Sequence, residues 1–169
     1  MIVKNKKKIQ VIKNFLDKSL HTQIKDTISG SNFPFYYNNN VTSPNDKIDD
    51  FYFTHNFFDN NNQSSTYFNE ILLPILYRIK FKTLIRAKCN LYTRKEKPIQ
   101  HSFHTDYNYP HKTLLYSINT NNGYTMFKSG EKIQSIENQL IMFDGLLEHC
   151  SVSQTDKKTR LNINVNILT

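Results

Sequence analysis

RLNINVNIL, residues 160–168, alternates polar and apolar side chains from Arg160 to Ile167. Successive side chains of a β-strand point to opposite faces. One face of this strand would carry an arginine and three asparagines, and the other would carry Leu161, Ile163, Val165 and Ile167. In an ordinary sandwich the polar face would meet solvent. An arginine among asparagines is instead typical of a barrel or sandwich that encloses a polar pocket.

The chain from residue 82 onward has the composition of consecutive strands separated by turns. Residues 83–92 alternate clearly, with Ala87 and Cys89 on one face and Lys88 and Asn90 on the other. Arg86 and Tyr92 share the second, polar face. Turn sequences such as Asn-Asn-Gly and Ser-Gly then delimit further predicted strands at residues 112–119, 124–127, 132–136, 139–143, 150–153 and 160–168.

The first 81 residues mix strands with two predicted helices. A strand is expected at residues 9–15, and a helix from Asp17, its expected N-cap, to Ser29, with Gly30 as its stop. An irregular loop is expected at residues 38–50, and a further strand at residues 51–58. Apolar residues at helical spacing predict a second helix over residues 65–79, which Pro74 would kink.

These elements predict a mainly β fold, a double-stranded β-helix (a cupin-like jelly roll) buttressed by two helices in the N-terminal half. The length of 169 residues suits one domain. We expect residues 1–81 to form a support region of helices and strands, and residues 82–169 to form the jelly-roll core with any metal site.

Composition points away from a membrane or secreted protein. No apolar run is long enough to span a membrane, no signal peptide is apparent, and the two cysteines form no disulfide framework. A cytoplasmic location is therefore expected. The net charge of +8 could attract nucleic acid, but no nucleic-acid-binding motif accompanies it, and a solvated basic face is the simpler interpretation.

His104-Thr105-Asp106, followed by the separate His149, has the composition of a metal site. Residues i and i+2 of a strand share a face, so His104 and Asp106 would point to one place. Two histidines and one carboxylate are the facial triad of non-haem Fe(II) oxygenases, which leaves coordination positions open. A structural zinc site would instead be closed by cysteines, and Cys89 and Cys150 lack ligand spacing.

With these residues in view, the chain resembles the Fe(II)/2-oxoglutarate-dependent dioxygenase superfamily. It is most similar to the prolyl-4-hydroxylase-like group and to the small oxygenases encoded by phages. The resemblance is carried by IQVIKNFLDKSLHTQI (residues 9–24), FPFYY (33–37), FHTDYNYPHKTLLYSINTNNGYTMF (103–127) and EHCSVSQTDKKTRLNINVNIL (148–168). The 21 asparagines also suggest an AT-rich, viral genome; the location would then be the host cytoplasm.

The resemblance implies an Fe(II) enzyme in which His104, Asp106 and His149 hold the iron and no other residue is catalytic. Arg160 would pair with the distal carboxylate of 2-oxoglutarate, as a bidentate guanidinium can. Tyr92, Asn90, Ser117 or the adjacent Tyr116 would supply a second contact to this co-substrate. The implied reaction consumes O2, converts 2-oxoglutarate to succinate and CO2, and hydroxylates a substrate.

The sequence leaves the substrate open. A protein side chain of prolyl type or a small molecule is favoured, and selectivity would depend on loops such as residues 38–50 and 93–98. An oxidative nucleic-acid dealkylase is an alternative, because Arg160-Leu161-Asn162 resembles the arginine-x-asparagine pattern of that branch. Its expected second arginine is replaced by Asn166. A non-enzymatic cupin-like binding module is the remaining alternative, and it would not need Arg160.

Overall fold

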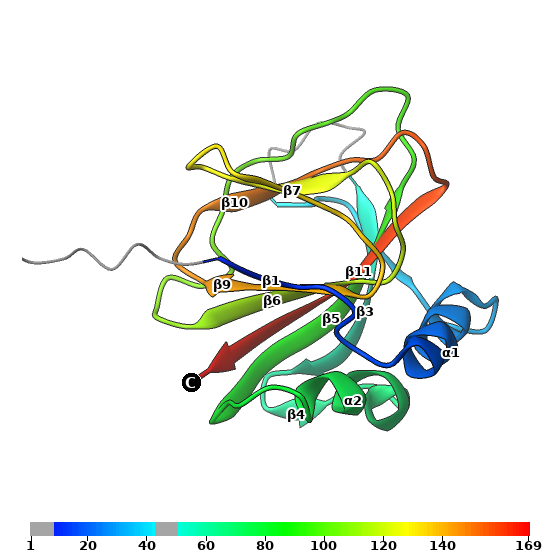
Figure 1. The fold of residues 1–169 in the computed structure, drawn as a ribbon, viewed down its shortest axis with the longest axis vertical. Coiled ribbons are helices and arrows are strands. Elements are labelled where there is room, and N and C mark those ends of the chain that lie inside the picture. Colours follow the sequence, from blue (N-terminus) through cyan, green and yellow to red (C-terminus); the bar gives the residue numbers. More distant parts are fainter. Residues whose placement is uncertain (1–8, 43–50) are drawn as a thin grey trace, which may run out of the picture.

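The computed structural model describes residues 9–42 and 51–169 and arranges their strands in two sheets that face each other (Figure 1). The small sheet has the order β10 (His149–Val152), β7 (Tyr124–Phe127) and β8 (Lys132–Gln134). The large sheet has the order β1 (Gln10–Ile12), β9 (Gln139–Asp144), β6 (Lys112–Ser117), β11 (Thr159–Leu168), β5 (Thr83–Thr93), β3 (Tyr52–Asp59) and β2 (Tyr36–Asn38), and β4 (Asn62–Gln63) pairs with β3. This arrangement confirms the predicted fold class.

The strand β11 lies between β5 and β6, antiparallel to both. Its apolar residues, including Ile163 and Val165, are fully buried in the main hydrophobic core on the outer face of the large sheet. Its polar residues face the space between the sheets and pair in register with β5, as Asn162 does with Asn90. The predicted alternation is confirmed, and the polar face meets an interior pocket and not solvent.

Helices cover the outer face of the large sheet (Figure 1). Ile24 and Ile28 of α1 (Lys18–Ser29) are buried in the main core, as are Ile71 of the π-helical turn η1 (Phe68–Leu72) and Ile75 of α2 (Leu73–Leu76). No helix among the residues described is long and apolar enough to cross a membrane.

Several predicted boundaries in the N-terminal half are wrong. The second helix does not run over residues 65–79: a π-helical turn precedes a single α-helical turn, where Pro74 lacks the N–H that a continuous helix would use. The first predicted strand shortens to β1. The first predicted helix is confirmed, with Asp17 at its N-cap and Gly30 at its C-cap; the Asp17 side chain makes no capping hydrogen bond and pairs with Arg78 at 2.6 Å. Of the predicted loop 38–50, residues 43–50 lie outside the described residues.

A second apolar cluster fills part of the space between the sheets. Phe127 of β7, Ile133 of β8 and Phe143 of β9 pack together there, and the Phe143 ring lies 4.9 Å from the ring of His149. The strand β9 serves both cores, since Leu140 faces the main core and Ile141 faces this cluster. The interior is therefore apolar on one side of His149 and polar on the other. Strands from both sides of residue 82 share the large sheet, with β3 beside β5.

Candidate metal centre

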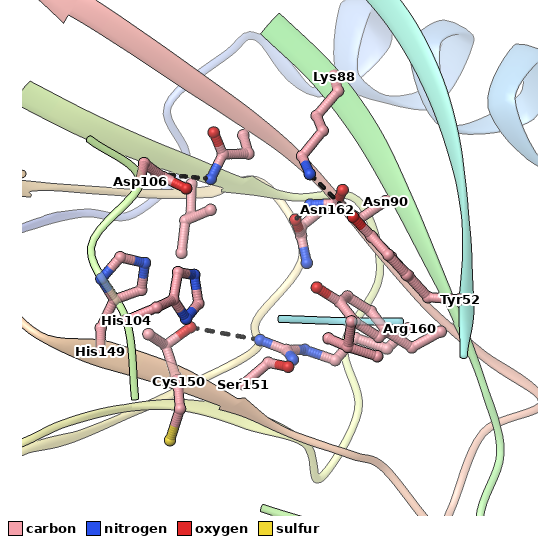
Figure 2. A pocket seen from close by; sticks show the side chains of 15 residues that line it. Tyr52, Lys88, Asn90, His104, Asp106, His149, Cys150, Ser151, Arg160 and Asn162 are labelled. Atoms are coloured by element: carbon pink, nitrogen blue, oxygen red, sulfur yellow. Dashed lines mark hydrogen bonds between the residues drawn. The ribbon is translucent and has the colours of Figure 1, made fainter. Parts of the chain in front are cut away.

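His104 and His149 are brought together by a backbone bridge between segments far apart in the sequence. Each donates its backbone N–H to the carbonyl oxygen of the other, both at 3.0 Å. The imidazole centroids lie 4.7 Å apart, on the same side of the bridge. The chain bends at Asp106, so the carboxylate faces the same place (Figure 2). One ligand atom each from His104, Asp106 and His149 lie within 4.8 Å of one another.

Backbone carbonyls set the orientation of both imidazoles. Nδ1 of His149 lies 3.0 Å from the carbonyl oxygen of Leu147, and Nδ1 of His104 lies 3.3 Å from that of Ser102. A carbonyl oxygen only accepts, so each Nδ1 carries the hydrogen, and each Nε2 keeps its lone pair for a metal. Burial lowers the pKa of His149, and the neighbouring His104 lowers it further. His149 is therefore kept in the neutral form that binds metals.

Asp106 is held as a carboxylate by side chains of the large sheet. Burial alone would raise its pKa, but the charge of Arg86, followed by His149 and a hydrogen bond from Asn166, holds that pKa well below its usual range. The guanidinium of Arg86 donates to Oδ1 at 3.0 Å, and the Asn166 amide donates to Oδ2 at 2.8 Å. Asn164 and Thr113 donate to Oδ2 at a longer 3.3 Å.

Arg160 lies across the same pocket from the three candidate ligands (Figure 2). Only 3% of its surface is exposed, and its guanidinium carbon lies 5.4 Å from the ring centroid of Tyr92. Nε donates to Ser135 at 2.9 Å and Nη2 to Thr125 at 3.3 Å. Within the described part of the chain, Nη1 is buried without a hydrogen-bond partner, and no carboxylate pairs with the side chain. A buried cation with a free donor is suited to an anionic ligand.

The structure separates the predicted co-substrate contacts into two groups. Tyr92 and Asn90 line the pocket with Arg160, and Oδ1 of Asn90 is buried without a hydrogen-bond partner among the described residues. Ser117 does not line the pocket. Tyr116 faces the main core instead, where its hydroxyl lies 2.7 Å from Nδ1 of His21. The empty space of the pocket is about 470 Å³ when the solvent at its mouth is counted.

Sequence reasoning missed the residues that position Asp106 and shape the pocket. Arg86 and Lys88 were placed on the polar face of their strand, yet nothing local indicates that one would contact Asp106 and the other Tyr52. The sequence also places Asn166 on the polar face of its strand but gives no sign of its contact with Asp106. The signal that could have found these residues was the shared polar face of residues 86–92 and 160–166, taken together with antiparallel pairing.

The donor set and the pocket fit Fe(II) and 2-oxoglutarate. Two imidazole nitrogens and one carboxylate within 4.8 Å can bind one metal ion and leave further positions open. The free donor of Arg160 fits the distal carboxylate of a dianionic 2-oxo acid. Among the residues described, only His104, Asp106 and His149 bring potential ligand atoms together here, so no cysteine closes the site.

Comparisons with known proteins agree with this geometry. No protein-family model matches the sequence, and no curated protein is significantly similar to it. Among solved structures, a 2OG-Fe(II) oxygenase from Burkholderia pseudomallei has a TM-score of 0.71 at 9% identity, covering 94% of this chain and 84% of that one. A prolyl hydroxylase from Trichoplax adhaerens, solved with a hypoxia-inducible-factor peptide fragment, has a TM-score of 0.63 at 14% identity over 97% and 84%.

A third similar structure is viral. The collagen prolyl hydroxylase of Paramecium bursaria Chlorella virus-1, solved with 2-oxoglutarate, has a TM-score of 0.60 at 12% identity and covers 99% of both chains. Likeness at such low identity establishes the fold. At the level of the fold it agrees with the resemblance noted from the sequence, because the three structures named here are a 2OG-Fe(II) oxygenase and two prolyl hydroxylases. The chain has the double-stranded β-helix fold of the 2OG-Fe(II) oxygenases.

Proposed function

We propose that this protein is an Fe(II)- and 2-oxoglutarate-dependent dioxygenase that hydroxylates a protein side chain or a small molecule and releases succinate and CO2. One observation carries the proposal. Three ligand atoms converge within 4.8 Å on one wall of a pocket, and a buried arginine with a free donor lies across that pocket. A cupin-like binding module would need the three ligands but would have no need of Arg160.

His104 and His149, each through Nε2, and Asp106 would hold the iron. Fe(II) bound there supplies the O2 activation that couples decarboxylation of 2-oxoglutarate to oxidation of a C–H bond. Arg160 would bind the distal carboxylate of the co-substrate, with Thr125 and Ser135 fixing its guanidinium. The protein therefore contributes binding and orientation.

Aromatic and apolar side chains surround Arg160 and the three candidate metal ligands. Tyr92 packs against the guanidinium of Arg160 and is itself stacked on Tyr52, with ring centroids 5.5 Å apart. Burial raises the pKa of Tyr92, so its hydroxyl stays protonated at neutral pH and can donate to a co-substrate oxygen. Leu115 and Phe143 add apolar surface near the ligands, which limits water around them.

The two hydroxylases named above act on prolyl residues according to their descriptions, which supports a prolyl-type protein substrate here. A small molecule remains the other proposed substrate class. Both cysteines, Cys89 and Cys150, are buried and free, which supports the proposed cytoplasmic location.

The test is release of labelled CO2 from 2-oxoglutarate labelled at its first carbon, in air, with and without Fe(II). We expect iron-dependent release that disappears in Asp106→Asn, because an amide is a poor iron ligand. Asp156→Asn is the matched control, since Asp156 only accepts a backbone hydrogen bond from Asn122 in an exposed turn. Equal release by the Asp106→Asn and Asp156→Asn proteins would refute the assignment of the metal site.

A further inference from the structure

Lys88 is a second cation that faces the pocket. It lies on β5 opposite Asn164, whereas Arg160 lies opposite Tyr92 further along the same pair of strands. In Figure 2 its side chain extends toward the hydroxyl of Tyr52, on the side of the pocket away from Arg160. The roles assigned above to iron and 2-oxoglutarate make no use of Lys88 or of the Tyr52 hydroxyl.

The contacts of Lys88 leave hydrogen-bond donors free. Its Nζ donates to the Tyr52 hydroxyl at 3.0 Å and lies 5.3 Å from the centroid of that ring. An ammonium has three N–H donors, and a phenol that accepts one hydrogen bond can still donate its own hydrogen. No carboxylate in the described ranges lies within ion-pair distance of Lys88, and the carboxylate of Asp106 pairs with Arg86. Burial lowers the pKa of Lys88, and the nearby Arg86 adds to this effect.

The charge balance of the loaded site also favours another anion. Lys88 and Arg160 are cations that line the pocket, Arg86 is a third cation paired with the pocket carboxylate of Asp106, and the iron would add two more positive charges. Asp106 and a 2-oxoglutarate dianion would neutralise only part of this charge. Uncompensated charge in a poorly solvated pocket is costly, and an anionic group on a further ligand would reduce that cost.

We propose that Lys88 and Tyr52 form a subsite for an anionic oxygen group, a carboxylate or a phosphate, on the substrate that is oxidised. The proposal rests on the proposed function and narrows its substrate class to acidic molecules or acidic segments. A lysine ammonium acts as a point charge with rotatable donors, which suits either anion. The adjacent phenol would add a second donor and fix the position of the anion beside the metal ligands.

The subsite can be tested by binding, independently of turnover. The protein is loaded with Zn(II), a diamagnetic substitute for Fe(II), and with 2-oxoglutarate, then titrated with acetate or with inorganic phosphate at constant ionic strength. The lysine side-chain resonances are followed by NMR. We expect a saturable shift of the Lys88 signal with one of the two anions. Lys88→Met and Tyr52→Phe should each lower the affinity for that anion about tenfold or more, the value of one charge-assisted hydrogen bond. Calorimetric titration measures the affinity, because Lys88→Met has no Lys88 signal.

Lys132→Met is the matched control. Lys132 lies 5.3 Å from the centroid of the Tyr124 ring, the same distance as between Lys88 and Tyr52, but it is exposed and does not line the pocket. The Lys132→Met protein should bind the anion as the wild type does. Tyr52→Phe retains Lys88 and most of the packing, so it tests the subsite even if Lys88→Met is unstable.

Two results would overturn the proposal. One is a Lys88 signal that saturates with neither anion, or that shifts no more than the exposed lysines. The other is a loss of 2-oxoglutarate affinity in Lys88→Met that is as large as its loss of affinity for the anion. Lys88 would then be part of the co-substrate site. Failure of the proposed function would look different: the Fe(II)–2-oxoglutarate charge-transfer band would be absent from the wild type, whatever acetate and phosphate do.

Discussion

Asp106 is the candidate ligand that depends most on its neighbours. Arg86 occupies one carboxylate oxygen and Asn166 the other, so the direction of the carboxylate is fixed before a metal arrives. The sequence predicts the three candidate ligands because His104-Thr105-Asp106 is local and His149 follows a hydrophobic run, and the structure brings their ligand atoms within 4.8 Å of one another. The roles of Arg86 and Asn166 were not predictable, because their contacts with Asp106 exist only once distant strands are paired in register.

At this scale we predict that Asn166→Ala lowers the affinity for Fe(II) about 10- to 100-fold, as loss of an outer-shell partner of a metal ligand typically does. Anaerobic calorimetric titration with Fe(II) measures it. Asn162→Ala is the control, because Asn162 hydrogen-bonds Asn90 and not Asp106. Wild-type iron affinity in the Asn166→Ala protein would mean that Asp106 does not depend on this contact.

The strand β11 links the core to the pocket. Its apolar face packs in the main core, and its polar face lines the pocket. Its alternation was readable from the sequence, as were the bounds of β7, because residues 124–127 lie between clear turn signals. The helices were harder to predict. Apolar spacing over residues 65–79 indicated one helix, but Pro74 and the π-helical turn before it interrupt the regular hydrogen-bond ladder.

For this element we predict that Ile163→Ala lowers the free energy of unfolding by about 2–5 kcal/mol, because it leaves a cavity in the main core. Urea denaturation of the metal-free protein measures the loss. Ile136→Ala serves as the control, since that side chain is 37% exposed and its truncation should cost less than about 0.5 kcal/mol. Similar losses in both variants would contradict the assignment of Ile163 to the core.

Buried imidazoles couple the stability of the whole molecule to pH. Burial lowers the pKa of His21, His55 and His149 in the folded state, so each binds a proton more readily when the chain unfolds. Nε2 of His21 is buried without a hydrogen-bond partner among the residues described, which adds to the cost of charging that ring. The unfolded chain therefore binds more protons between these lowered pKa values and the ordinary value of about 6.5.

The free energy of unfolding should accordingly fall as pH is lowered from 7.5 to 5.5 and level off below the lowered pKa values. Asp106 does not add to this loss of stability between pH 7.5 and 5.5. Its pKa lies below its usual range, so its contribution to the free energy of unfolding is lost only in stronger acid. Urea denaturation of the metal-free protein at several pH values measures the trend. A stability that is constant or rises toward pH 5.5 would show that these histidines are not buried in neutral form.

At the scale of the whole molecule, alternation and turn signals predicted a double-stranded β-helix with a polar interior, and the fold bears this out. The register between β5 and β11 could not be predicted from the sequence. This register places Tyr92 opposite Arg160 and Lys88 opposite Asn164. Registry depends on contacts between segments many residues apart, and a shift of one residue would turn every side chain to the other face. The walls of the pocket therefore became known only from the structure.

Anaerobic titration with Fe(II) and then 2-oxoglutarate, followed through the visible charge-transfer band of a chelated 2-oxo acid, tests the central claim most directly. We predict a saturable band in the wild type that disappears when O2 is admitted, with succinate formed. In Arg160→Met, iron affinity should be kept while 2-oxoglutarate affinity falls about tenfold or more, since one charge-assisted contact is lost. A folded, iron-loaded protein that shows no band at any 2-oxoglutarate concentration would contradict the account.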